Sequence, residues 1–123
     1  KLAAREDLRQ PALAELLQLD DAAFRSFFSG SPVKRIGRDR FLRNVLIAAG
    51  NSGDFSLVPT VRCLLGDGSP LVRGAAIWAL SQLVPKPEFT ELGKTALQTE
   101  KDDIVRNEWL SAMPASVAVE SQT

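Results

Sequence analysis

The sequence predicts an all-α protein: an α-solenoid of two to three helix pairs preceded by two short helices. Apolar residues recur at helical spacing through most of the 123 residues. No segment alternates apolar and polar residues between turn signals, as a half-buried strand would. A short motif also recurs at intervals of 30 and 33 residues, which is typical of stacked helix pairs.

Residues 1–30 are expected to form an N-terminal helical segment. Its first helix begins at Pro11, since the fixed φ of proline suits a first turn, and continues through strong helix formers. Asp20 or Asp21 can cap the second helix, which should reach Phe28 before residues 30–32 (Gly-Ser-Pro) interrupt it.

Residues 31–113 are expected to form the repeats. Helical apolar spacing predicts five helices there, and a glycine or proline ends four of them, all except 88–98: residues 38–49, 55–65, 70–84, 88–98 and 103–113. Residues 50–53 (Gly-Asn-Ser-Gly) should end the first of these helices, and Ser69 and Asp102 should cap two later ones. Residues 114–123 are expected to be a frayed tail.

The recurring motif contains an arginine at positions 43, 73 and 106. Aligning residues 42–49, 72–79 and 105–112 places each arginine away from the apolar stripe of its helix. Such a position favours hydrogen bonds to carboxylates or helix-end carbonyls of the adjoining repeat, with Asp67 and Asp102 or Asp103 as partners. For Arg43 a contact to RNA is the alternative. Residues 67–80 resemble the HEAT-like repeat consensus, so the predicted fold class is a HEAT-like α-solenoid.

The composition excludes most catalytic chemistry. The chain has no His and one Cys, so it has no imidazole base, no cysteine–histidine pair and too few ligands for a cysteine-ligated metal site. Cys63 is expected to be a small buried hydrophobe. Trp78 and Trp109 are expected in the core, with stacking on a base or a partner as the alternative. The first residue is Lys1, so a piece of a longer protein is expected.

The charge is balanced overall, with 15 basic and 15 acidic residues, but a basic run lies between residues 34 and 43. The candidate site consists of five cations and an adjacent amide: Lys34, Arg35, Arg38, Arg40, Arg43 and Asn44. The run precedes and opens a predicted helix, where free N–H groups and the helix dipole favour phosphate. Gly37 would allow close backbone approach. The alternative is a solvated surface turn.

Residues 31–53 resemble the C-terminal HEAT-like region of the epoxyqueuosine reductases, enzymes of queuosine biosynthesis that modify transfer RNA. Residues 1–84 fit the same family. The resemblance implies cobalamin and two [4Fe-4S] clusters in the parent enzyme, held by other domains, with no cofactor in this non-catalytic chain.

The same resemblance implies contact with the tRNA anticodon region, and the six candidate residues are those that match the family's basic stretch. One unpaired Cys and no secretory signal pattern favour the cytoplasm, and neither membrane nor DNA is expected as a partner. The alternative is a protein-interaction or interdomain-packing module whose basic run faces an acidic surface of its parent.

Overall fold

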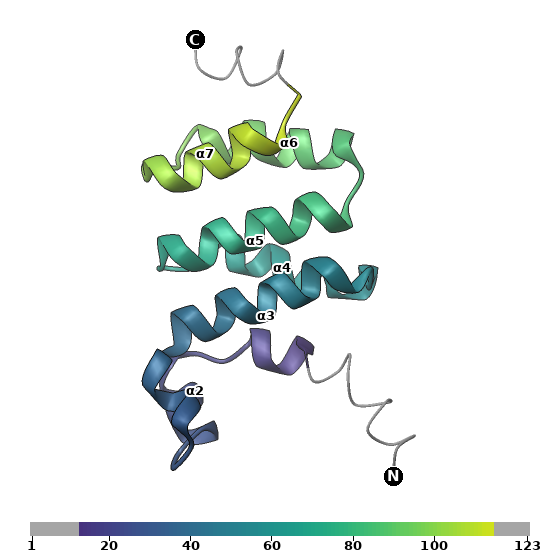
Figure 1. Cartoon of the computed structure of the whole chain (residues 1–123). Coiled ribbons are helices and arrows are strands. Elements are labelled where there is room, and N and C mark those ends of the chain that lie inside the picture. Colours follow the sequence, from purple (N-terminus) through teal and green to yellow (C-terminus); the bar gives the residue numbers. More distant parts are fainter. Residues whose placement is uncertain (1–12, 115–123) are drawn as a thin grey trace.

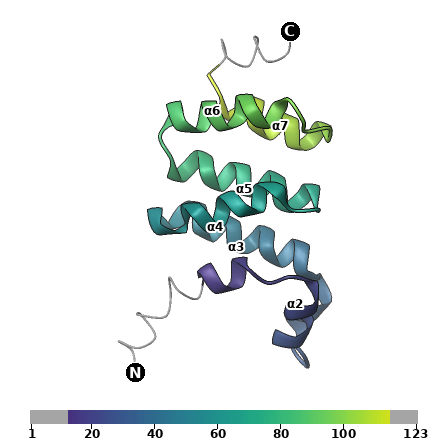
Figure 2. The ribbon, with the colours of Figure 1, turned by 180° about the vertical axis from the view of Figure 1, so that it is seen from behind.

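The computed structural model describes residues 13–114, and all regular structure in that range is helical. Helices α3 (Arg38–Ser52), α5 (Pro70–Leu83) and α7 (Asp103–Ala112) stack in one layer (Figure 1). Helices α4 (Val58–Cys63) and α6 (Lys86–Leu97) form the second layer, which is seen from behind in Figure 2. The predicted all-α, HEAT-like solenoid is confirmed.

The core lies between the two layers and continues from one repeat to the next. Two positions of the aligned motif are at most 1% exposed in every copy: Leu42, Val72 and Val105, then Leu46, Ala76 and Trp109. This agreement confirms the alignment of the three copies. Because α3 and α7 pack on opposite sides of α5, each helix pair buries its apolar surface against its neighbours.

The predicted terminating segment, residues 50–53, does end the first repeat helix, but it does so at Gly53, and Gly50 lies inside the helix. Helix α3 continues to Ser52 and ends at Gly53, which has a left-handed φ of 69°. A Cβ at position 50 would lie 2.6 Å from Cζ3 of Trp78 and 3.1 Å from Cα of Ala79. Gly50 therefore allows α5 to approach α3 closely.

The second layer is less regular than predicted. Residues 55–65 form a 3₁₀ turn η2 (Phe55–Leu57), then α4, then a further turn η3 (Leu64–Gly66). The carboxylate of Asp54 accepts a hydrogen bond from the Ser56 N–H at 3.0 Å, and Pro59 lies in the first turn of α4. Helix α6 begins at Lys86, two residues earlier than predicted, because Pro87 is accommodated in its first turn.

The N-terminal segment is joined to α3 by aromatic packing. Residues 13–17 are helical, and α2 (Asp21–Phe27) is capped by Asp20, whose carboxylate accepts from the Ala23 N–H at 2.8 Å. The predicted break at residues 30–32 is confirmed: α2 ends at Phe27, Gly30 has a positive φ of 79°, and a separate 3₁₀ helix, η1 (Pro32–Ile36), follows. The predicted helix start at Pro11 and residues 115–123 of the predicted tail lie outside the described residues. No helix between residues 13 and 114 is long and apolar enough to cross a bilayer.

Candidate functional site

Five exposed polar side chains lie on η1 and on the first two turns of α3. Lys34 and Arg35 lie on η1, and Arg40, Arg43 and Asn44 lie on α3; we call these five residues the basic surface. Within residues 13–114 none of its four cations forms an ion pair with a carboxylate. The surface therefore presents positive charge that the described part of the chain does not neutralise.

Local sequence explains how η1 and α3 present these cations. The hydroxyl of Ser31 accepts a hydrogen bond from the Val33 N–H at 3.2 Å and starts η1. Gly37, with φ 85° and ψ 160°, then separates η1 from α3 in a conformation that favours glycine. Because Leu42 and Leu46 face the core, Arg40, Arg43 and Asn44 lie on the exposed side of α3. Asp39 is also exposed there and pairs with Arg38.

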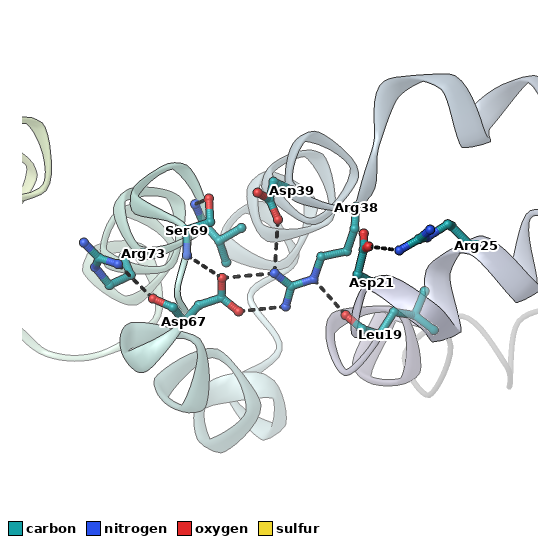
Figure 3. A network of polar contacts seen from close by, with 9 residues as sticks. Leu19, Asp21, Arg25, Arg38, Asp39, Asp67, Ser69 and Arg73 are labelled. Atoms are coloured by element: carbon teal, nitrogen blue, oxygen red, sulfur yellow. Dashed lines mark hydrogen bonds and ion pairs between the residues drawn. The ribbon is translucent and has the colours of Figure 1, made fainter.

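Arg38 differs from the other predicted site residues because its side chain is only 15% exposed and already bonded. Nε donates to the Leu19 carbonyl at 2.9 Å, and Nη1 donates to Asp39 at 3.1 Å (Figure 3). Nη1 and Nη2 also donate to the two carboxylate oxygens of Asp67, at 3.0 and 2.7 Å. These hydrogen bonds hold the pKa of Asp67 below its ordinary value and raise the pKa of Arg38. Arg38 therefore joins the N-terminal segment, α3 and the loop between η3 and α5.

A second arginine–carboxylate pair repeats this arrangement between α5 and α7. Arg73 donates from Nε and Nη2 to the Glu100 carboxylate at 2.9 and 3.0 Å. These bonds lower the pKa of Glu100. Arg73 also donates from Nη1 to the Asp67 carbonyl at 2.9 Å, as Figure 3 shows. We call the pairs Arg38–Asp67 and Arg73–Glu100 the ladder.

The structural prediction is confirmed for two of the three recurring arginines, Arg73 and Arg106. Arg73 bonds the adjoining repeat, and Arg106 donates from Nη1 to the Leu97 and Glu100 carbonyls at 2.7 and 3.0 Å. For Arg43 the structural prediction is wrong within the described residues, where its guanidinium bonds only Asn44, at 3.2 Å.

Arg43 differs from Arg73 and Arg106 because its helix begins further ahead of the arginine. Helix α3 begins at Arg38, five residues before Arg43, whereas α5 and α7 begin three residues before Arg73 and Arg106. In α3 the two additional residues before Arg43 put Arg38, rather than Arg43, where its guanidinium can bond the next repeat.

The predicted acidic partners are partly right. Asp67 does accept from arginine, but Asp102 caps α7 by accepting from the Ile104 and Val105 N–H groups at 2.9 and 3.1 Å. The second acid of the ladder is Glu100, which the sequence reading missed. Its signal was present, because Asp67 and Glu100 each lie six residues before the arginine of their own repeat.

The remaining candidates divide between core and surface. Trp109 is 1% exposed, so its predicted core position is confirmed. Trp78 packs against the core and also lines a groove of about 350 Å³, beside Ile47, Leu71 and Ile104. Cys63 is exposed, so the prediction of a buried residue is wrong. Among residues 13–114 no group of three potential ligands could hold a metal ion.

Comparison with known proteins places this fold in a family. The family model that describes HEAT repeats matches residues 38–113. The chain belongs to the HEAT repeat family. This match covers α3 to α7, the part of the chain that contains the ladder.

The HEAT-repeat chain is similar to part of several epoxyqueuosine reductases, which confirms the predicted resemblance. It is 38% identical over 87 residues to the enzyme of Alicycliphilus denitrificans, covering 64% of this chain and 24% of the relative. The enzyme of Listeria monocytogenes is 34% identical over 109 residues, covering 88% of this chain and 28% of the relative.

A solved structure of epoxyqueuosine reductase with an epoxyqueuosine-modified tRNA-Tyr stem loop superposes with a TM-score of 0.72 at 26% identity. That match covers 89% of this chain and 28% of the other. The chain thus spans about a quarter of the length of these relatives.

Proposed function

We propose that this chain is a non-catalytic RNA-docking domain of an epoxyqueuosine reductase, and that it binds the anticodon stem-loop of tRNA through the basic surface. The observation that carries the proposal is the exposure of four cations without a carboxylate partner among the described residues. A similar solved structure is of an epoxyqueuosine reductase with a tRNA stem loop, which supports RNA as the ligand.

The residues divide into direct contacts and a positioning residue. Lys34, Arg35, Arg40 and Arg43 can each reach phosphate oxygens, and Asn44 can add a neutral hydrogen bond. Arg38 has four of its hydrogen bonds committed to the protein, so it acts by holding the start of α3 against α5. Binding of this kind reads backbone and shape, because contacts to phosphate carry little base information.

The donor set of this chain does not fit the cofactors that the resemblance implies for the parent enzyme. One cysteine and no histidine cannot ligate a [4Fe-4S] cluster. In this proposal the clusters, the cobalamin and the reduction belong to other parts of the enzyme, and the HEAT repeats hold the RNA in the cytoplasm.

The test is a titration of the purified chain with an anticodon stem-loop at several salt concentrations. Binding should weaken with salt, since each phosphate neutralised in a single strand contributes about −0.7 to the slope of log K against log salt. A triple variant carrying Lys34→Glu, Arg35→Glu and Arg40→Glu should lose binding. Each of these substitutions made singly should make the slope of log K against log salt shallower. Circular dichroism and thermal unfolding should be unchanged, because all three side chains are exposed.

A matched control places the same charge change on the opposite layer, with Arg62→Glu, Lys86→Glu and Lys94→Glu. These three exposed cations lie on α4 and α6. The control variant should keep most of the affinity. Equal loss in both triple variants, or no binding by the wild-type chain even at low salt, would contradict the proposal.

The second candidate is a protein-interaction or interdomain-packing module. The observation in its favour is the apolar groove across α3, α5 and α7, whose rim includes Ile104 with 75% of its surface exposed. Stem-loop binding that is unchanged by the basic-surface variant would favour this second candidate.

A further inference from the structure

Helix α2 ends on a phenylalanine whose ring faces solvent. Phe27 is 63% exposed, and its ring packs edge-on against Phe28 with 4.8 Å between centroids and 65° between planes. Phe28 contacts Phe41 at 4.9 Å and Phe24 at 5.1 Å, and Phe24 is 1% exposed. Phe27 is therefore the outer member of a ring cluster that is anchored in the fold.

This cluster lies beside the basic surface. The Ser31 N–H donates to the Phe28 carbonyl at 2.9 Å, and the Lys34 N–H donates to the Ser31 carbonyl at 3.2 Å, so two successive turns lead from α2 to the first cation. Phe41, which holds Phe28, directly follows Arg40 in α3. Figure 1 shows α2 beside the beginning of α3.

We propose that Phe27 is a stacking platform for an unpaired base of the RNA whose phosphates lie on the basic surface. The inference rests on the proposed function and adds to it a preference for single-stranded RNA. An aromatic face next to a row of cations is the combination that single-stranded nucleic acids use, with phosphates on the cations and a base on the ring. A base in a duplex already stacks on its neighbours, so only an unpaired base can use the platform.

Two properties of the Phe27 side chain favour stacking by a base. The Phe27 ring turns about only two side-chain torsions and is in contact with Phe28, so ordering it on a base costs little conformational entropy. A stacked base also covers apolar surface that the fold leaves in water. Stacking is tolerant of base identity, so Phe27 would distinguish loop from stem without reading sequence.

The test compares two RNAs with equal numbers of phosphates, an anticodon stem-loop and a blunt duplex, on variants of Phe27. Phe27→Ala should weaken stem-loop binding by about tenfold, should leave duplex binding unchanged and should leave the salt slope unchanged. Phe27→Leu should recover less than half of the lost affinity on a logarithmic scale, since it restores apolar area without an aromatic face. The matched control is Phe55→Ala, which removes a 70% exposed phenylalanine from η2 and should not affect binding.

The outcomes separate this inference from the proposed function. If the basic-surface variant loses binding while Phe27→Ala binds the stem-loop as the wild type does, only the stacking platform is refuted. Equal loss for both RNAs, equal loss in Phe55→Ala, or complete rescue by Phe27→Leu would also overturn it. If the wild-type chain binds neither RNA at low salt, the proposed function fails and this inference fails with it.

Discussion

Replacing Arg73 by methionine should lower the free energy of unfolding by about 2 kcal/mol, because it removes one pair of the ladder. Methionine retains much of the apolar stem and removes the guanidinium. The substitution deletes three hydrogen bonds, two to the Glu100 carboxylate and one to the Asp67 carbonyl. The Glu100 carboxylate would then still accept the hydrogen bond from the N–H of Asp102, at 3.0 Å.

The magnitude follows from the exposure of the pair. The side chains of Arg73 and Glu100 are 18% and 12% exposed. Breaking a buried ion pair costs about 3–5 kcal/mol, and losing an exposed pair costs about 0–1 kcal/mol. A pair that is mostly but not fully shielded lies between these limits.

The assay is urea unfolding followed by circular dichroism, at constant pH and salt. The matched control is Arg43→Met, since Arg43 occupies the same motif position but is exposed, and its cost should stay within about 0.5 kcal/mol. A double-mutant cycle with Glu100→Gln should give a coupling of about 1 kcal/mol or more. If Arg73→Met and Arg43→Met lower the free energy of unfolding by the same amount, the claim that the Arg73–Glu100 pair stabilises the fold is refuted.

Three further predictions follow from the packing and the charges. The folded state lowers the pKa values of Asp67 and Glu100, so both carboxylates stabilise the fold at pH values above the ordinary carboxyl pKa of about 4. This contribution to the free energy of unfolding is lost as the pH falls through the lowered folded-state pKa values. Glu100→Gln should therefore reduce the difference in the free energy of unfolding between pH 7 and pH 3, measured by urea unfolding. Gly50→Ala should cost about 1–3 kcal/mol because its Cβ would overlap Trp78; thermal unfolding checks this, and an unchanged midpoint would contradict the close packing. The thiol of Cys63 should react with a thiol reagent in the folded state nearly as fast as in urea, whereas strong protection in the folded state would contradict its exposure.

The helical pattern was predictable because its causes are local. Caps such as Asp20, Ser69 and Asp102 act within three residues, and the apolar spacing directly indicates which side of a helix is buried. The alignment of the three motif copies therefore matched two positions that are buried in every copy, although Ile47, Leu71 and Ile104 are exposed. The basic run was also visible in the sequence, since exposure of Lys34 and Arg35 needs only a polar turn that no other element covers.

The errors concern contacts that join distant parts of the chain. Gly50 looked like a helix end, but its role depends on a tryptophan 28 residues later. Arg38 looked like one more free cation, but its guanidinium bonds a carboxylate 29 residues away. Neither relation has a local signature in the sequence.

The amino-acid sequence by itself determined that this chain forms paired amphipathic helices with a recurring arginine and a basic run at one helix start. Only the tertiary structure decided which arginines are held and which remain free. The physical reason is that a guanidinium bonds the carboxylate that lies within about 3 Å of it. That distance depends on where each helix begins and how closely the layers stack.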